Sequence, residues 1–334
     1  MINLLLTPPF RFNVAPDVLD HQGELAPILK QYGIKLTRQP AKADLELAGA
    51  YYFPDKPTWR LPKNRVVVIT PEPPQPDYLE AAYLDSGFAA VLSPVDGTVQ
   101  APDCMAYFEP PRLPRKKRIE KIEKIVLMAT FRYNLGNDGA GAFMNVRVNG
   151  GGTHRHRTLA YARSLTGLVL KRLRPEAIDL YGRYWPRGAA VTENSREAPD
   201  WRERKLALLG RYGFNLCWEN SEIPGYVTEK IWDSIDAGVL PLYWGPPEFH
   251  ALLPPDSVLD CRRYLDGGEL LVEALLDDAL SLSAADYARR VETLYDWHRS
   301  IDPDAKKKSA LAAAHILGRE LTAALAAGAV KKAA

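Results

Sequence analysis

Residues 214–245 read FNLCWENSEIPGYVTEKIWDSIDAGVLPLYWG, and this stretch decides the fold. The apolar run over 214–218 predicts a buried strand that ends in a polar loop. Apolar residues at helical spacing over 228–237 predict a helix, and a second apolar run over 239–243 predicts another strand. A strand, a helix and a strand in this order form the repeating unit of a parallel sheet. The stretch therefore predicts an α/β fold.

The expected helix over 228–237 has a recognisable start, face and end. Thr228 is a residue type that favours the helix N-cap, and Gly238 supplies a left-handed end. Ile231 and Ile235 are four residues apart, so they share one face, which we expect to be buried. The N-terminus of this helix points N–H groups and a partial positive charge toward the carboxyl ends of the strands.

Lys230 lies in the first turn of this helix, where a cation opposes the helix dipole. A bound phosphate converts that unfavourable position into a charge-assisted contact, which is the pattern of a nucleotide-diphosphate site. The alternative is an ordinary helix that carries a surface pair of Glu229 and Lys230. The residues alone weight the two interpretations equally.

The same alternation of strands and helices runs through both halves of the chain. A loose loop rich in glycine and asparagine is expected over 134–153, and a helix is expected to follow it over 157–173. We expect an α/β protein with two Rossmann-like domains facing a cleft, C-terminal helices, and ligands at the carboxyl ends of the strands. The other expected strands are 1–6, 34–36, 45–48, 65–70, 89–93, 125–131 and 178–181, and the other expected helices are 14–32, 77–86, 201–209, 269–280, 284–299 and 305–327.

The segment from Pro110 to Arg118 marks the boundary between the two alternations. Its prolines and basic residues are typical of an exposed interdomain connector, and the alternative is a patch that binds an anionic lipid or acidic glycan. The predicted division is a domain over 1–110, a basic proline-rich linker over 111–120, a domain over 121–300 and an alanine-rich C-terminal helix over 301–334.

Composition excludes several classes of protein. The 334 residues include 43 Lys and Arg against 41 Asp and Glu, and a net charge of +2 argues against a nucleic-acid binder. No run of 18 or more apolar residues predicts a membrane span. The 3 cysteines form no CxxC pair, which disfavours a disulfide scaffold and a cysteine zinc site. The apolar start is too short for an export signal, so we expect a cytoplasmic protein.

The C-terminal helix leaves one question of location open. Its leucines recur at roughly helical spacing, and Lys331 and Lys332 follow it. Packing across the domains is the plain interpretation, and peripheral attachment to the inner face of the membrane is the sharper alternative.

The 214–245 stretch closely resembles the donor-binding motif of glycosyltransferase family 10, the α-1,3/4-fucosyltransferases, here of bacterial type. That motif reads approximately Phe-x-Leu-x-Phe-Glu-Asn-Ser, a short loop, Tyr-Val-Thr-Glu-Lys, an amphipathic turn or two, and Pro-x-Tyr-Trp-Gly. The resemblance implies a GT-B fold and an inverting, metal-independent glycosyltransferase. It implies GDP-β-L-fucose as the donor and an α-linkage to a glycan acceptor that contains N-acetylglucosamine. The domain over 1–110 then holds the acceptor and the domain over 121–300 holds the donor.

The resemblance carries donor-site roles onto particular residues. Lys230 matches the lysine that holds the donor phosphates. Tyr226, Glu229 and Asn220 match residues that contact the phosphates, ribose and fucose.

Two further donor contacts are implied with less definite positions. A pyrophosphate-binding arginine stands at the start of a helix in the family; Arg157 is favoured here, with Arg155 as the close alternative. Arg183, within Tyr-Gly-Arg at 181–183, matches a strand end near the donor base.

An inverting transfer needs a base opposite the leaving GDP, and Glu72 is the best candidate. It follows the expected strand 65–70 and lies between prolines that restrict its loop. The resemblance to the family's catalytic glutamate is loose, so a solvent-facing glutamate is the alternative. Asp302 and Asp304 have metal-motif spacing but lie between late helices, where a capping turn is favoured, so no metal or other cofactor is expected.

Two rival functions stay open on the sequence. A match at the phosphate-binding motif is compatible with another nucleotide sugar, because few residues contact the fucose itself. A non-catalytic protein that binds a sugar nucleotide or glycan would keep Lys230 and lack the base. The acceptor, the linkage position and the oligomeric state are not predicted.

Overall fold

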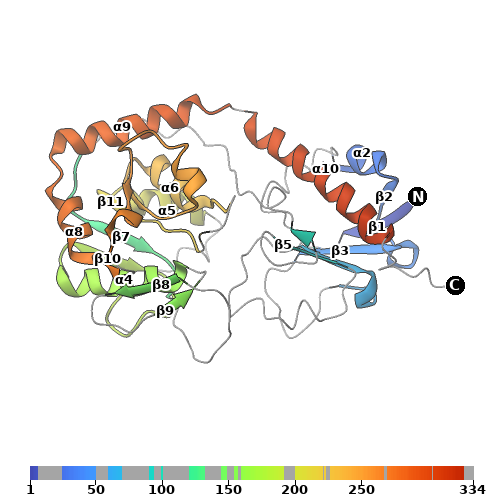
Figure 1. Ribbon diagram of the computed structural model, residues 1–334, viewed down its shortest axis with the longest axis horizontal. Helices are drawn as coiled ribbons and strands as arrows, with labels where there is room; N and C mark the ends of the chain where they lie inside the picture. Colours follow the sequence, from blue (N-terminus) through green and yellow to red (C-terminus); the bar gives the residue numbers. More distant parts are fainter. Residues whose placement is uncertain are drawn as a thin grey trace. The chain divides into compact units, whose positions relative to one another are not determined.

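A computed structural model describes the chain in separate stretches (Figure 1). Residue contacts divide it into two compact units, the first holding 1–110, 223–226 and 302–334, and the second holding 111–222 and 227–301. The described residues are 1–6, 25–49, 59–69, 90–93, 99–100, 120–131, 144–148, 154–156, 159–191, 200–220, 222, 226–266, 269–302 and 304–326.

The first unit is built on a six-stranded parallel sheet in the order β2-β1-β3-β4-β5-β6. Continuous apolar runs form its central strands, as expected where both faces of a parallel sheet are covered. Leu4, Leu45, Leu47 and Val66 are fully buried. The strands are β1 (Ile2–Leu6), β2 (Ile34–Thr37), β3 (Leu45–Gly49), β4 (Val66–Ile69), β5 (Ala90–Ser93) and β6 (Val99–Gln100), with 3-10 helices η1 (Pro40–Lys42) and η2 (Lys63–Arg65).

The C-terminal helix α10 (Ala305–Ala326) belongs to this first unit and packs on α2 (Leu25–Gln31). Figure 1 draws the two side by side, red against blue. Tyr32 Oη lies 3.0 Å from His315 Nδ1, and Thr322 Oγ1 donates to the Tyr32 carbonyl at 3.4 Å. Among the residues that the structure describes, no helix has both the length and the apolar character needed to cross a membrane.

The second unit holds a five-stranded parallel sheet in the order β10-β7-β11-β12-β13. The chain runs from β7 to β10 on one side and then crosses to β11 on the other. The strands are β7 (Ile125–Met128), β10 (Ile178–Tyr181), β11 (Phe214–Leu216), β12 (Leu240–Tyr243) and β13 (Leu259–Asp260). The helices are α4 (Leu159–Leu173), α5 (Trp201–Leu209), α6 (Glu229–Ala237), α7 (Pro247–His250), α8 (Val272–Ser281) and α9 (Ala284–Ser300), with the 3-10 helix η5 (Cys261–Tyr264).

A third, small sheet corrects the expectation of a loose loop over 134–153. Strand β8 (Met144–Val148) pairs antiparallel with β9 (His154–His156) and parallel with β15 (Glu269–Leu270), which pairs with β14 (Leu265–Asp266). The partner β15 lies more than a hundred residues away, so no local pattern could reveal it. The two flanking helices accordingly begin at Leu159 and Val272, two and three residues later than expected.

Both sheets confirm the α/β class with two Rossmann-like domains. The helix expected over 228–237 is also confirmed as α6. Ile231 and Ile235 are 0% and 4% exposed, and Gly238 adopts a φ of +69°. That left-handed conformation suits glycine because it has no Cβ.

Candidate functional site at the carboxyl ends of β7 and β11

The strand order fixes where the second unit is expected to bind a ligand. The chain runs outward from β7 to β10 on one side, then crosses back to β11 on the other side of β7 and continues outward to β12 and β13. The topological switch point therefore lies between β7 and β11. In open parallel α/β sheets, ligands bind outside the carboxyl ends of the strands at this point. The residues that follow β11, Glu219 and Asn220, therefore lie at the expected binding edge.

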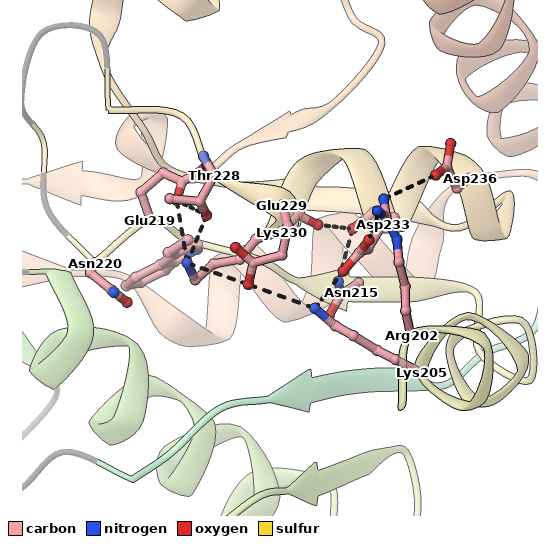
Figure 2. A network of polar contacts seen from close by, with 12 residues as sticks. Arg202, Lys205, Asn215, Glu219, Asn220, Thr228, Glu229, Lys230, Asp233 and Asp236 are labelled. Carbon is pink, nitrogen blue, oxygen red and sulfur yellow. Dashed lines mark hydrogen bonds and ion pairs between the residues drawn. The ribbon is translucent and has the colours of Figure 1, made fainter. Parts of the chain in front are cut away.

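Glu219 is the buried centre of this edge (Figure 2). Its Oε1 accepts from the Thr228 backbone N–H at 2.9 Å and from Tyr243 Oη at 3.2 Å. Its Oε2 accepts from Thr228 Oγ1 at 2.6 Å and lies 3.5 Å from Lys230 Nζ. The carboxylate thus ties the end of β11 to the end of β12 and to the start of α6.

Burial is the main influence on the Glu219 pKa, which lies above its ordinary value. The nearby Lys230 ammonium and the Thr228 hydrogen bonds oppose that rise because they favour the charged carboxylate. Burial and the adjacent carboxylate likewise raise the pKa of Tyr243, which stays a neutral donor. The arrangement holds a carboxylate and an ammonium close together in a poorly solvated place.

Thr228 begins α6 in a way that the N-cap rule does not describe. Its backbone has N-cap geometry, but its side chain makes no cap hydrogen bond to the helix. Instead its hydroxyl donates to Glu219 and accepts from Lys230 Nζ at 2.7 Å. Lys230 is thereby held back over the helix N-terminus, and its side chain is 17% exposed.

Asn220 is fixed by α4 from the other side of the switch point. Its backbone carbonyl accepts from the N–H groups of Leu159 and Ala160, at 2.6 and 3.2 Å, which are the first two of α4. Its side-chain Oδ1 accepts from Arg163 Nη2 at 3.0 Å, and Arg163 Nη1 donates to the Trp218 carbonyl. Arg163 is 4% exposed, so a buried guanidinium joins α4 to the loop after β11.

Glu229 faces away from Lys230's partners and toward α5. Lys205 Nζ lies 3.8 Å from Glu229 Oε1 and 2.5 Å from Asp233 Oδ2, and Arg202 lies 3.5 Å from Asp233. Arg202 also lies 3.8 Å from Asp236, and Figure 2 shows these groups spread along α6. This cluster joins α5 to α6, and Glu229 is its member nearest to Lys230.

The end of β12 is held by a histidine. The Gly245 N–H donates to His250 Nε2 at 3.4 Å, and His250 Nδ1 lies 3.7 Å from Asp260 Oδ2. Burial lowers the pKa of His250 to about 4, so its ring is neutral near pH 7 and can accept that bond. Arg262 pairs with Asp260 at 2.7 Å and, by its hydrogen bonds, holds that carboxylate's pKa low against the effect of burial.

The three tryptophans of the motif region serve the core. Trp218, Trp232 and Trp244 are each 0% exposed, and the rings of Trp218 and Trp244 are 5.1 Å apart. Buried aromatic rings of this size contribute packing to the core.

The structure brings three of the predicted donor-site residues to one edge: Asn220, Glu229 and Lys230. Tyr226 is 2% exposed and groups with the first unit. Arg183 is exposed just beyond β10, and its carbonyl accepts from the Phe131 N–H beyond β7.

The remaining predicted site residues are not fully described. Arg155 is described only as the backbone of β9, and Arg157 and Glu72 lie outside the described residues. Within the described stretches, no group of three or more His, Cys, Asp or Glu side chains is placed to hold a metal ion.

Three structural residues of the site were not predicted. The sequence predicts a polar loop at Glu219 and a helix N-cap at Thr228, and it predicts no role for Arg163. The hydrogen bonds of these three residues to one another's neighbours appear only in the structure. One feature of the sequence could have pointed to Arg163. It is the only charged residue in a stretch of apolar and small residues that reads LAYARSLTG, and it lies on the buried face of α4.

Comparison with known proteins identifies the segment that carries most of this site. Residues 169–317 match the model described as glycosyltransferase family 10 (fucosyltransferase), C-terminal part. This part of the chain is similar to glycosyltransferase family 10. The family segment includes the motif around Lys230 and the strands β10 to β13, and Arg163 lies just before it.

Proteins with similar sequences come from different organisms. An alpha-(1,4)-fucosyltransferase of Arabidopsis thaliana is 34% identical over 95 residues, which are 28% of this chain and 23% of that protein. The alpha-(1,3)-fucosyltransferase FucT of Helicobacter pylori is 36% identical over 69 residues, 21% of this chain and 14% of that protein. The matches thus span less than a quarter of these relatives' own lengths.

A crystal structure of an alpha1,3-fucosyltransferase with GDP-fucose aligns with a TM-score of 0.41 and 16% identity, over 87% of this chain and 81% of that one. The fold described above rests on the strands and helices of this chain and not on that alignment.

Proposed function

We propose that this chain is an inverting fucosyltransferase that moves L-fucose from GDP-β-L-fucose to a hydroxyl of a glycan acceptor. The observation that carries the proposal is the position of Lys230. It lies at the N-terminus of α6, beside the switch point, within a segment that matches the model of a fucosyltransferase family. An ammonium and a helix N-terminus at the carboxyl edge of a parallel sheet suit a diphosphate.

Lys230 is supported in this role by its two partners. Its ammonium is held by the Thr228 hydroxyl at 2.7 Å and by the Glu219 carboxylate at 3.5 Å. A diphosphate at the helix N-terminus adds charge-assisted contacts to the same ammonium and screens its repulsion from the helix dipole. Negative charge builds up on GDP as the sugar leaves, so this cation stabilises the departing group.

The proposed reaction is a single displacement. An acceptor hydroxyl oxygen attacks the anomeric carbon of fucose, the bond from that carbon to the GDP oxygen breaks, and the configuration inverts from β to α. Glu72 takes the hydroxyl proton as general base. Arg157, or Arg155 in its place, together with Lys230 neutralises the pyrophosphate without a metal ion. An N-acetylglucosamine-containing glycan is the proposed acceptor class.

The test is calorimetry with GDP, UDP, ADP, CMP, GDP-mannose and GDP-fucose in EDTA. We expect binding selective for GDP-fucose and GDP, at least about tenfold weaker in Lys230→Ala, because a hydrogen bond to a charged group contributes about 1.5–3 kcal/mol. Tight binding of a different nucleotide in place of GDP contradicts the donor. Affinity unchanged by Lys230→Ala contradicts the assignment of the phosphate site.

The base is tested separately. Glu72→Gln is expected to abolish transfer to an N-acetyllactosamine acceptor while GDP affinity stays unchanged. Full transfer activity in Glu72→Gln contradicts Glu72 as the base. Binding of GDP-fucose without transfer by the unchanged protein to any glycan of an acceptor panel supports a non-catalytic sugar-nucleotide binder.

A further inference from the structure

Arg163 donates hydrogen bonds to two points of the loop that follows β11. One guanidinium nitrogen donates to the Trp218 carbonyl and the other donates to Asn220 Oδ1 at 3.0 Å. The two acceptors are two residues apart in the loop after β11, directly at the switch point between β7 and β11. Because the guanidinium is planar with its donors in a fixed fork, it sets the separation and direction of both acceptors.

The identity of Arg163 decides how the Asn220 amide is turned. An arginine side chain only donates hydrogen bonds, so the atom of Asn220 that faces it must be the carbonyl oxygen Oδ1. The amide NH₂ is therefore turned away from Arg163. The Asn220 backbone cannot rotate to undo this, because its carbonyl is held by the first two N–H groups of α4.

The α4 N-terminus also restricts where an anion can bind. The N–H groups of Leu159 and Ala160 already donate to the Asn220 carbonyl. A phosphate on this side of the switch point would have to displace that carbonyl to reach them. These two N–H groups are thus already engaged by the protein itself.

We propose that Arg163 is a positioning residue that turns the Asn220 amide so that its NH₂ donates to an oxygen of the nucleotide-sugar donor. The inference rests on the proposed function for the identity of that donor. It adds a residue buried at 4% exposure, outside the family segment, to the machinery of the site.

The decisive variant is Asn220→Asp. An aspartate still accepts from Arg163 and gains a charge pair with it, so its melting temperature should equal or exceed that of the unchanged protein. It replaces the NH₂ donor with a carboxylate oxygen, which repels a diphosphate sugar. We expect at least about tenfold weaker GDP-fucose binding from loss of one hydrogen bond to a charged group.

Arg163→Lys tests the positioning step. Lysine keeps the charge but presents a single ammonium without the fork, so it cannot hold both carbonyls in the same geometry. The Michaelis constant for GDP-fucose should rise several-fold with kcat little changed, because an orienting contact to the bound donor is weakened. Arg172→Lys, at an exposed position of the same helix, is the matched control and should change neither value.

Three results would overturn the inference. The first is an Asn220→Asp variant that binds GDP-fucose within about twofold as tightly as the unchanged protein does. That result would reject the Asn220 contact and leave the proposed function intact. The second is additive loss of affinity in the Arg163→Lys, Asn220→Ala double variant, since residues that act through one another are non-additive. The third applies if the unchanged protein binds no GDP-fucose, which contradicts the proposed function and the donor contact together. The orienting role of Arg163 is then judged by the same cycle measured as melting temperature, and additive shifts reject it.

Discussion

Glu219 is a buried carboxylate that the family resemblance did not assign to the donor site, and it connects several parts of that site. Its two oxygens accept three hydrogen bonds, from the Thr228 N–H, the Thr228 hydroxyl and the Tyr243 hydroxyl, and it is fully buried. A buried carboxylate is tolerable only when its acceptor capacity is filled and a cation is near. Lys230 provides that cation, so the group proposed to bind phosphate also neutralises the core of the site.

Glu219→Gln is expected to lower the free energy of unfolding by about 2 kcal/mol. The Gln amide NH₂ cannot accept the Thr228 hydroxyl proton, and that hydroxyl already accepts from Lys230. Urea denaturation measures the loss. Glu222→Gln is the control: Glu222 accepts one bond from Trp244 Nε1 at 2.9 Å, and the Gln carbonyl can replace it. Equal stability of the two variants would contradict the expectation.

The paired helices α5 and α6 show how an element is held by charge as well as by packing. Lys205 Nζ lies 2.5 Å from Asp233 Oδ2, and the Asp233 side chain is 1% exposed. Burial raises the pKa of Asp233, opposed mainly by Lys205. The cation therefore favours the charged form of a buried carboxylate at the interface of the two helices, against the effect of burial.

Lys205→Met is expected to cost about 3 kcal/mol of stability, because it leaves that buried carboxylate with a weaker partner. Arg204→Met, on the same helix, removes an exposed pair with Asp200 and should cost much less, because solvent screens exposed ion pairs. Both values come from chemical denaturation. A loss in Lys205→Met no larger than in Arg204→Met means that the pair contributes nothing.

Helix α9 carries a buried histidine that makes stability depend on pH. His298 is 1% exposed, stacks on Trp232 at 5.6 Å, and neither ring nitrogen has a hydrogen-bond partner among the described residues. Burial lowers its pKa from 6.5 to about 4. The unfolded chain thus takes up the proton first, so the stabilisation is complete above pH 6.5 and is lost as the pH falls toward 4.

We expect His298→Leu to reduce the stability difference between pH 7 and pH 4 by up to about 3 kcal/mol. Thermal melts across that range measure it. Phe249→Leu, in the same aromatic group around Trp232, carries no titrating side chain and should lower stability equally at every pH. A pH profile of His298→Leu parallel to that of the unchanged protein would contradict the assignment.

At the scale of the whole molecule, the last helix of the chain completes the first unit. Gly318 of α10 lies against the Tyr32 ring, and a Cβ at this glycine would come within 2.3 Å of Tyr32 Cδ2. Ala314, Leu317 and Leu321 of the same helix are buried. The first unit therefore cannot be complete until the C-terminal segment has been made.

Gly318→Val is expected to cost about 2–3 kcal/mol, because an overpacked contact forces α10 away from α2. Hydrogen exchange locates the effect: protection should fall in α2, α10 and β1 and persist in β7, β11 and β12. Ala312→Val, at an exposed position of α10, is the control with a helix-propensity loss of about 0.5 kcal/mol or less. Equal loss of protection in both units would show that they unfold together.

The sequence predicted what depends on local order along the chain. Helix α6 was expected over 228–237 and is found over Glu229–Ala237, and the apolar run before it forms β11. The spacing of Ile231 and Ile235 and the position of Gly238 fix such elements without reference to distant residues. Asn220, Glu229 and Lys230, which the motif predicts as donor contacts, lie at one edge of the sheet, and their contact with a donor stays a prediction.

The sequence does not show which distant residues become contact partners. The strand pairing of β8 with β15, the docking of α10 on α2, and the grip of Arg163 on Asn220 each join residues many positions apart. Thr228 illustrates the same limit. Its residue type predicted a side-chain cap, but its hydroxyl donates to the buried Glu219 carboxylate instead. The sequence by itself determined the α/β class, the helix of the motif and its candidate phosphate-binding lysine, because periodicity and capping are local. The tertiary structure alone decided which partners contact Lys230 and Asn220. The physical reason is that a buried polar group must form its hydrogen bonds with the groups that the fold brings near it.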